Sequence, residues 1–212
     1  NNQIILPMAA SENLITHPPL YSYVAAVFGK IFSPLLSLHD AARLSNIFWA
    51  GLILTSLGLM TRELWGQGFG RQAGLIFLGS VGLILNIHSL MPEIATLLGY
   101  TMALYAFSLY FRRPFRASMV LGFGSGIGFL SGGIIPLVVI FLSSLFLLIF
   151  KNWRNKRYLI FFGISTTIMI LIISPWLYAF NYLEPELFLS WIKIIKFSPE
   201  LLFNYHLQGI LW

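Results

Sequence analysis

Long apolar runs, separated by short polar segments, dominate the hydrophobic pattern of this chain. A helix that crosses a membrane needs about 20 residues, with about 17 as the lower limit. The fourth run is short by this measure unless its flanks join it. The pattern predicts an all-α, polytopic membrane helix bundle with about six transmembrane helices. The predicted runs are Leu44–Met60, Ala73–Leu90, Ile94–Phe111, Ala117–Leu130, Ile134–Phe150 and Tyr158–Phe180.

Two further stretches have amphipathic character. Leu20–Leu36 is apolar but carries paired tyrosines, Lys30 and Pro34, and Glu184–Lys196 repeats large apolar residues at four-residue steps. Amphipathic helices of this kind lie in the membrane interface. We therefore predict two interfacial, juxtamembrane helices, with a full span as the alternative for the first.

These elements predict one membrane domain in three parts. Residues 1–43 form an outer loop and interfacial helix, residues 44–180 the six transmembrane helices, and residues 181–212 an outer juxtamembrane segment. The chain begins Asn-Asn-Gln, without an initiator Met or a signal-peptide pattern, and ends within an apolar run. This favours a piece of a longer protein.

Composition supports a bilayer as the solvent. Hydrophobic residues make up 58% of the 212 residues and charged residues only 9%, whereas soluble domains carry about 25% charged residues. The absence of cysteine excludes disulfides and thiolate metal sites. The net charge of +6 is better explained by basic loops that orient a membrane protein than by nucleic-acid binding.

Basic residues gather in three alternate loops, which predicts the orientation of the helices. If these loops are cytoplasmic, as the positive-inside rule requires, the six helices alternate without contradiction. The turns at 90–92 and 131–133, the region before Leu44 and the tail after Phe180 then lie on the outer side. The loop cations are Arg62, Arg71, Arg112, Arg113, Arg116, Lys151, Arg154, Lys156 and Arg157.

Glycines concentrate in the fourth apolar run. The pairs Gly122/Gly126 and Gly124/Gly128 have the spacing that lets helix backbones approach closely. A phosphate-binding glycine loop would need a preceding strand and a nearby lysine. We interpret the glycines as helix-packing residues.

Polar residues of catalytic type fall on the predicted outer side. Pro18 and Pro19 fix the backbone after His17, and Pro18 favours an extended conformation at His17. Histidines and carboxylates near membrane helix ends are costly unless paired or solvated, so they are functional candidates. The outer-side group is His17, His39, Asp40, Arg43, Asn86, His88, Glu93, Glu184, Glu186 and His206.

Each candidate also has a structural explanation. Asp40 and Arg43 have the spacing of an ordinary helix-start ion pair, and Glu93 follows Pro92 in a first helical turn, where acids are favoured. His88 is better explained as a membrane-interface residue than as a ligand. These residues lack tight metal-ligand spacing such as HExxH, so no metal or cofactor is predicted, although a divalent metal stays an open alternative. No nucleophile motif occurs either.

Five motifs in order resemble the bacterial dolichyl-phosphate-mannose-protein mannosyltransferase-like family, which includes aminoarabinose transferase of lipid A. They are His17-Pro18-Pro19-Leu20-Tyr21, Ala42-Arg43-Leu44, Met91-Pro92-Glu93, Gly128-Phe129-Leu130-Ser131-Gly132-Gly133 and Ser174-Pro175-Trp176. The segment Glu184–Trp191 also matches one that often follows the Pro-Trp pair. Each motif is weak alone, but their order and spacing are specific, and they cover essentially the whole chain.

The resemblance implies a C-type glycosyltransferase fold in the bacterial inner membrane, with an active site that faces the periplasm. Such enzymes move a sugar from a polyprenyl-phosphate carrier to a lipid, glycan or protein acceptor, as in lipid A modification and protein glycosylation. The family's catalytic acid lies upstream of the Pro-Pro motif, and this chain begins too late to contain it. The fragment is therefore expected to be incomplete for catalysis.

The resemblance also implies roles for individual residues. His17 and Arg43 are expected to contact the donor phosphate, Tyr21 and His88 to bind substrate, and Glu93 to orient or deprotonate an acceptor. In the family a lysine usually precedes the Pro-Pro pair, and another precedes the glycine at position 133. His17 and Gly132 stand there in this chain, and Glu93 replaces a more usual aspartate.

Two other functions stay open. A non-catalytic homologue or assembly partner in a glycan pathway fits the missing lysine at Gly132. A transporter would need charged or broken helices at mid-membrane depth, and the apolar runs contain almost none.

Overall fold

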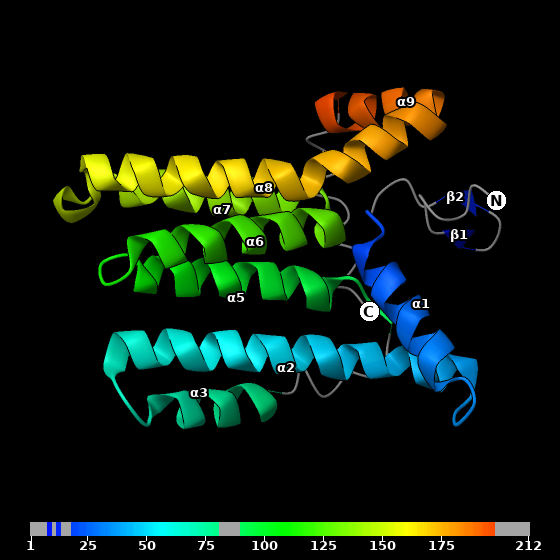
Figure 1. Cartoon of the computed structure of the whole chain (residues 1–212), viewed down its shortest axis with the longest axis horizontal. Helices are drawn as coiled ribbons and strands as arrows, with labels where there is room; N and C mark the ends of the chain where they lie inside the picture. The colour runs from blue at the N-terminus through cyan, green and yellow to red at the C-terminus, as the bar shows by residue number, and fades with distance from the viewer. Residues whose placement is uncertain (1–7, 10–11, 14–17, 81–89, 198–212) are drawn as a thin grey trace. The chain divides into compact units, whose positions relative to one another are not determined.

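The computed structural model describes residues 8–9, 12–13, 18–80 and 90–197, and nearly all of them are helical (Figure 1). The described chain forms two compact units, one within His17–Ile173 and one from Asn1–Thr16 and Ser174–Trp212. The elements are β1 (Met8–Ala9), β2 (Glu12–Asn13), α1 (Leu20–Phe32), α2 (Leu38–Trp65), α3 (Phe69–Leu78), α5 (Glu93–Leu109), α6 (Pro114–Gly132), α7 (Ile134–Leu147), η2 (Lys151–Trp153), α8 (Lys156–Leu183) and α9 (Pro185–Phe197).

These helices confirm the predicted all-α membrane bundle. Two of them, α2 and α8 with 28 residues each, are long and apolar enough to cross a membrane by length and composition. In α5 and α7 the apolar stretch is shorter, with 17 and 14 residues. The second predicted run begins in α3 and continues into residues 81–89, which lie outside the described part. Six crossings therefore remain a prediction.

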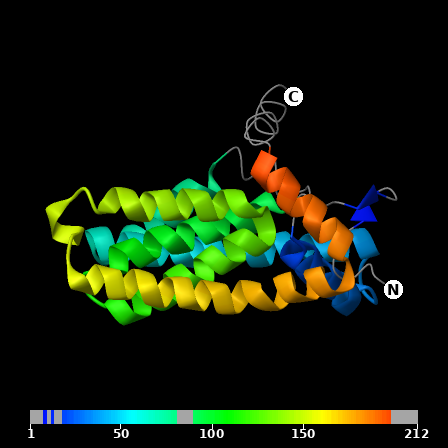
Figure 2. The same ribbon diagram turned by 90° about the horizontal axis from the view of Figure 1, so that it is seen from above.

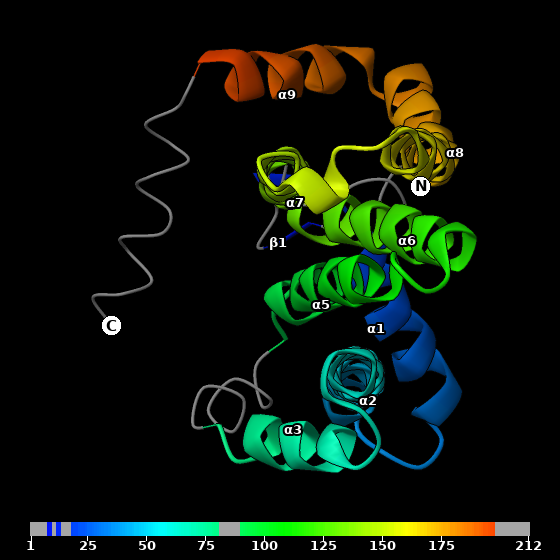
Figure 3. The ribbon, with the colours of Figure 1, turned by 90° about the vertical axis from the view of Figure 1, so that its left-hand side faces the viewer.

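Within the larger unit the helices run along a common direction, and α1 is inclined to them (Figures 1 and 2). Viewed along the bundle, α3, α2, α5 and α6 follow one another, with α7 beyond α6 (Figure 3). The first part of α8 also packs on α6, because Ile168 and Ile172 meet Gly122 and Gly126.

The glycine-rich run is a continuous helix, as the packing interpretation predicted. Its two glycine pairs face two different neighbours. Gly122 and Gly126 face α8, while Gly124 and Gly128 face Gly99 and Met102 of α5. A Cβ placed at Gly99 would lie 2.8 Å from the Gly124 carbonyl oxygen and 2.8 Å from the Gly128 Cα. The α5 and α6 backbones therefore touch directly.

The polarity of the helices is that of a membrane protein. Buried positions include small polar residues, and several of their hydroxyls bond to the carbonyl four residues earlier, as Ser144 does to Ile140 at 2.8 Å. Large apolar side chains point outward, and Ile76 is 76% exposed. A soluble protein rarely exposes such extensive apolar surface, whereas lipid accommodates it.

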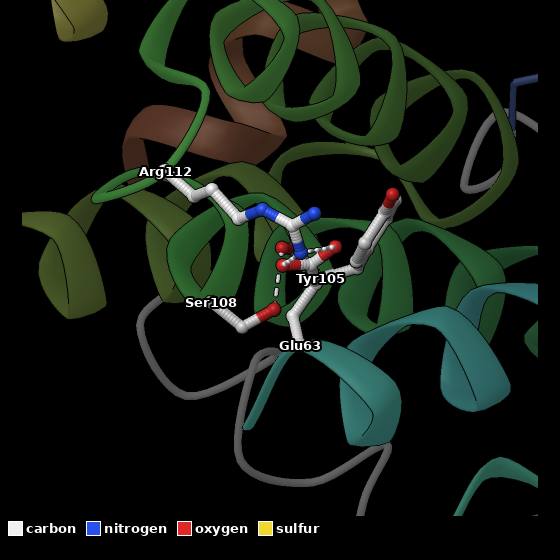
Figure 4. A network of polar contacts seen from close by, with 4 residues as sticks. All are labelled: Glu63, Tyr105, Ser108 and Arg112. Atoms are coloured by element: carbon white, nitrogen blue, oxygen red, sulfur yellow. Dashed lines mark hydrogen bonds and ion pairs between the residues drawn. The ribbon is translucent and has the colours of Figure 1, made fainter. Parts of the chain in front are cut away.

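The three basic loops lie at the same end of the larger unit, at the left in Figure 1. Arg112, after α5, donates two hydrogen bonds to Glu63 near the end of α2, at 3.0 and 3.3 Å (Figure 4). The predicted common side of these loops is thus confirmed. That this side is cytoplasmic remains a prediction.

The opposite end contains the short connections. Gly133 alone separates α6 from α7, at φ 72°, and its N–H donates to the Phe129 carbonyl at 2.8 Å. Glycine adopts this left-handed conformation without steric cost. The 131–133 turn between α6 and α7 is therefore tight.

The smaller unit has two local features. Met8–Ala9 pairs antiparallel with Glu12–Asn13, a short hairpin that the apolar pattern did not predict. The predicted tail helix is confirmed as α9, where Trp191 packs 5.8 Å from Trp176 and 6.1 Å from Phe180, between ring centroids.

Candidate functional site

Three of the five predicted site residues lie in the described chain, at the end of the larger unit opposite the basic loops. Tyr21 is in the first turn of α1, Arg43 in the second turn of α2, and Glu93 begins α5. His17 and His88 lie outside the described residues, so their roles stay predictions.

Tyr21 is held between α1 and α2. Pro18 and Pro19 are buried immediately before the helix, and the Pro19 carbonyl accepts from the Tyr23 N–H at 2.9 Å. This start of the helix turns Tyr21 inward, where it is 5% exposed and its hydroxyl donates to Asn46 Oδ1 at 2.8 Å. The pair links residues 25 positions apart.

The ionisation of Tyr21 reports on what surrounds its hydroxyl. Burial raises the pKa of Tyr21 above 10.0, polar groups of Ser45 and Met91 near the hydroxyl oppose that rise, and the Glu93 carboxylate raises the pKa further. The hydroxyl therefore stays protonated at neutral pH. It lies where α1, α2 and the start of α5 meet.

This position indicates a structural role for Tyr21 in the site. A hydroxyl that is buried and already bonded to Asn46 is poorly placed to stack on a sugar. The predicted substrate contact of Tyr21 stays a prediction, and its observed hydrogen bond joins α1 to α2.

Replacing Tyr21 with phenylalanine is expected to lower the free energy of unfolding by about 1 kcal/mol, the usual net contribution of one hydrogen bond. Because the pKa is raised in the folded state, the tyrosine also makes stability fall as pH rises through 10.0. Thermal unfolding at pH 9 and pH 11 checks this, with Tyr178→Phe, which replaces an exposed tyrosine of α8, as the control. An equal alkaline loss in wild type and Tyr21→Phe would contradict it.

Arg43 and Asp40 stand at the start of α2, which Ser37 caps. The Asp40 N–H donates to Ser37 Oγ at 3.2 Å, and the Ser37 hydroxyl donates to Asp40 Oδ2 at 2.6 Å. Arg43 Nη1 lies 3.6 Å from Asp40 Oδ1, in a largely exposed pair. However, Arg43 Nε is buried and has no hydrogen-bond partner within the described chain.

Glu93 is exposed at the first position of α5, where the helix dipole favours a carboxylate. Pro92 precedes it, and the Pro92 carbonyl accepts from the Thr96 N–H at 3.1 Å. Tyr21 packs in one core cluster with Ala95, two residues after Glu93, so the start of α5 lies beside Tyr21. Arg43 lies on α2, three residues before Asn46, the hydrogen-bond partner of Tyr21.

Asn46 and Thr96 are site residues that the sequence analysis missed. Asn46 is 1% exposed although it stands within a predicted membrane run, and an amide within such a run was a usable signal. Thr96 had no comparable signal, because its neighbour Gly132 is distant in sequence.

Thr96 explains the glycine at position 132. A Cβ on Gly132 would lie 2.6 Å from Thr96 Oγ1 and 2.9 Å from Pro136 Cγ. The end of α6 therefore packs against the first turn of α5, and no side chain fits at position 132 without displacement.

Gly132→Lys is expected to destabilise the protein by about 1–3 kcal/mol, as overpacking does. Thr96→Ala removes Oγ1 and Cγ2, the two Thr96 atoms that the new side chain would meet, and should recover part of that loss. Thermal unfolding of the single and double variants measures the coupling. Additive effects would contradict the contact.

No group of three histidine, aspartate or glutamate side chains that could hold a metal ion occurs in the part of the chain that the structure describes. The site as described offers a carboxylate, a guanidinium and a buried neutral hydroxyl.

Residues 16–178 match the family described as dolichyl-phosphate-mannose-protein mannosyltransferase. The chain is also 31% identical, over 179 residues, to undecaprenyl phosphate-alpha-4-amino-4-deoxy-L-arabinose arabinosyl transferase 1 of Sodalis glossinidius (strain morsitans). This alignment includes 77% of the chain but only 31% of that relative. The chain thus spans about a third of the relative's length. No solved structure matches.

Proposed function

Because the chain belongs to the dolichyl-phosphate-mannose-protein mannosyltransferase family, we propose that it is part of a membrane glycosyltransferase that takes its sugar from a polyprenyl-phosphate carrier. The observation that carries this proposal is that Tyr21, Arg43 and Glu93 stand near the starts of α1, α2 and α5, at the end of the bundle away from the basic loops. The name of the Sodalis relative, which contains both undecaprenyl phosphate and a sugar, supports the choice of donor.

In this proposal Arg43 binds the donor phosphate. Transfer breaks the bond between the anomeric carbon and the phosphate oxygen, so negative charge grows on the phosphate. A preorganised cation stabilises that charge. Arg43 is suited to this because its Nε donor is buried and unused by the described residues, and Asp40 orients the guanidinium.

Glu93 orients the acceptor or accepts its proton. A new bond forms between the acceptor oxygen and the anomeric carbon, and the acceptor proton must pass to a base. Glu93 is exposed at the start of α5, two residues before Ala95, which packs with Tyr21 in one core cluster. Tyr21 and Asn46 act as positioning residues that hold α1 and α2 beside it.

The apolar outer surfaces of the helices accommodate the lipid tail of the carrier. The site lies at the end away from nine basic loop residues. If those loops are cytoplasmic, the site faces the periplasm of a bacterial inner membrane. Lipid, glycan and protein acceptors all fit this placement.

Arg43→Gln in the full-length protein tests the phosphate contact. Transfer from a polyprenyl-phosphate-linked sugar in proteoliposomes should show a KM for the donor raised about tenfold, the loss of one charged hydrogen bond of about 1.5 kcal/mol. Lys30→Gln, which removes an exposed charge from α1, should leave KM unchanged. No transfer by the wild type from any polyprenyl-phosphate sugar would favour a non-catalytic homologue.

A further inference from the structure

The three basic loops form one continuous surface. The Glu63–Arg112 ion pair, at 3.0 Å, joins the end of α2 to the α5–α6 loop. Ring contacts join that loop to the next: the Phe111 and Trp153 centroids are 4.6 Å apart, and those of Tyr110 and Trp153 are 5.0 Å apart. The loops are therefore held together by described contacts and do not act as separate basic segments.

This surface has a high charge density. It carries nine basic residues and one acid, a net charge of +8, and all nine basic residues are exposed. The acid, Glu63, has a side chain only 14% exposed, against 63% for its partner Arg112. The cations are Arg62, Arg71, Arg112, Arg113, Arg116, Lys151, Arg154, Lys156 and Arg157.

Large apolar side chains are exposed among these cations. Phe111, Phe115 and Ile149 are 60%, 63% and 65% exposed. A soluble polyanion has no apolar part that could contact such side chains. A molecule with a negative headgroup and an acyl chain satisfies both the cations and the apolar residues.

We propose that this surface, formed by the nine cations together with Tyr110, Phe111 and Trp153, binds the headgroups of anionic phospholipids in the leaflet that it faces. Arginine pairs with phosphate through parallel hydrogen bonds, and each basic residue near an anionic leaflet contributes about 1 kcal/mol. Of the nine cations, only Arg112 and Arg154 make a side-chain hydrogen bond or ion pair with other described residues. The charges of the other seven, which include Arg113, Arg116, Lys156 and Arg157, are available to lipid. The binding is separate from sugar transfer, which takes place at the other end.

The test uses the full-length protein in proteoliposomes with trace spin-labelled phosphatidylglycerol or phosphatidylcholine. Electron spin resonance gives the ratio of their association constants at the protein surface. Wild type should prefer phosphatidylglycerol severalfold, and 0.5 M salt should weaken the preference, because salt of roughly this strength screens exposed charges. Absence of any preference in the wild type would overturn the proposal.

Two paired variants place the lipid contact on this surface. Arg113→Gln/Arg116→Gln and Lys156→Gln/Arg157→Gln each keep seven of the nine cations, which preserves the loop charge that orients the chain. Each should lower the preference by about twofold or more, since about 1 kcal/mol per residue corresponds to about fivefold in full contact. Arg113→Lys/Arg116→Lys should retain it. An equal loss in Lys30→Gln, on α1, or displacement of the lipid by low concentrations of polyglutamate would overturn it, the latter in favour of an acidic protein.

Discussion

Glu93→Gln in the full-length protein is expected to lower the turnover of sugar transfer by about a hundredfold, while the protein folds and inserts as the wild type does. Glutamine keeps the size of the side chain but neither carries charge nor accepts a proton. Proton transfer by a positioned carboxylate typically contributes about 10²–10⁴ in rate. The carboxylate is exposed, so its replacement leaves no buried group unpaired. Single-turnover transfer from the lipid-linked donor is the measurement.

Glu186 provides a matched control. It also follows a proline in the first turn of a helix, α9, so Glu186→Gln causes the same loss of a favourable charge at a helix start. Its transfer rate should equal that of the wild type. Equal rates in Glu93→Gln and wild type would show that Glu93 serves only the helix start.

Gly99→Ala is expected to lower the free energy of unfolding by about 3 kcal/mol or more. The added methyl would meet the Gly124 carbonyl oxygen and the Gly128 Cα at 2.8 Å each. Both are backbone atoms, so no side chain can rotate away, and overpacking of this kind costs at least about 1–3 kcal/mol. Separation of α5 from α6 also displaces Glu93, so transfer should fall with stability.

Gly163→Ala and Gly51→Ala are the controls for this variant. Both glycines lie within helices and have no atom within 4 Å of an added Cβ. Each replacement should leave stability unchanged or raise it by up to about 1 kcal/mol, the difference in helix propensity. Thermal unfolding in detergent measures all three. If Gly99→Ala unfolds like the controls, α5 and α6 do not pack backbone to backbone.

The helices were predictable because lipid exposure imposes a strong pattern. Long apolar runs predict where helices form, and basic loops predict which helix ends lie on the same side, even without packing information. The positions of α2 and α8 and the common end of the three basic loops follow from these two patterns. The glycine pairs of α6 were also predictable, since close helix contact favours few other residues. The sequence did not show which pair faces which neighbour.

The site was predictable only in part. Glu93 and Tyr21 were indicated by their motifs, but the bond between Tyr21 and Asn46 depends on how α1 crosses α2. No periodicity encodes that geometry. From the sequence, Gly132 was a departure from the family pattern, in which a lysine stands at this position. Only the structure shows that Thr96 leaves no room for a side chain there.

The single residue between α6 and α7 has a mechanical consequence. A protease or an inserted epitope finds no extended segment at Gly133. When the protein is pulled from its C-terminal side, the two helices should leave the bilayer together as one hairpin, in a single force peak.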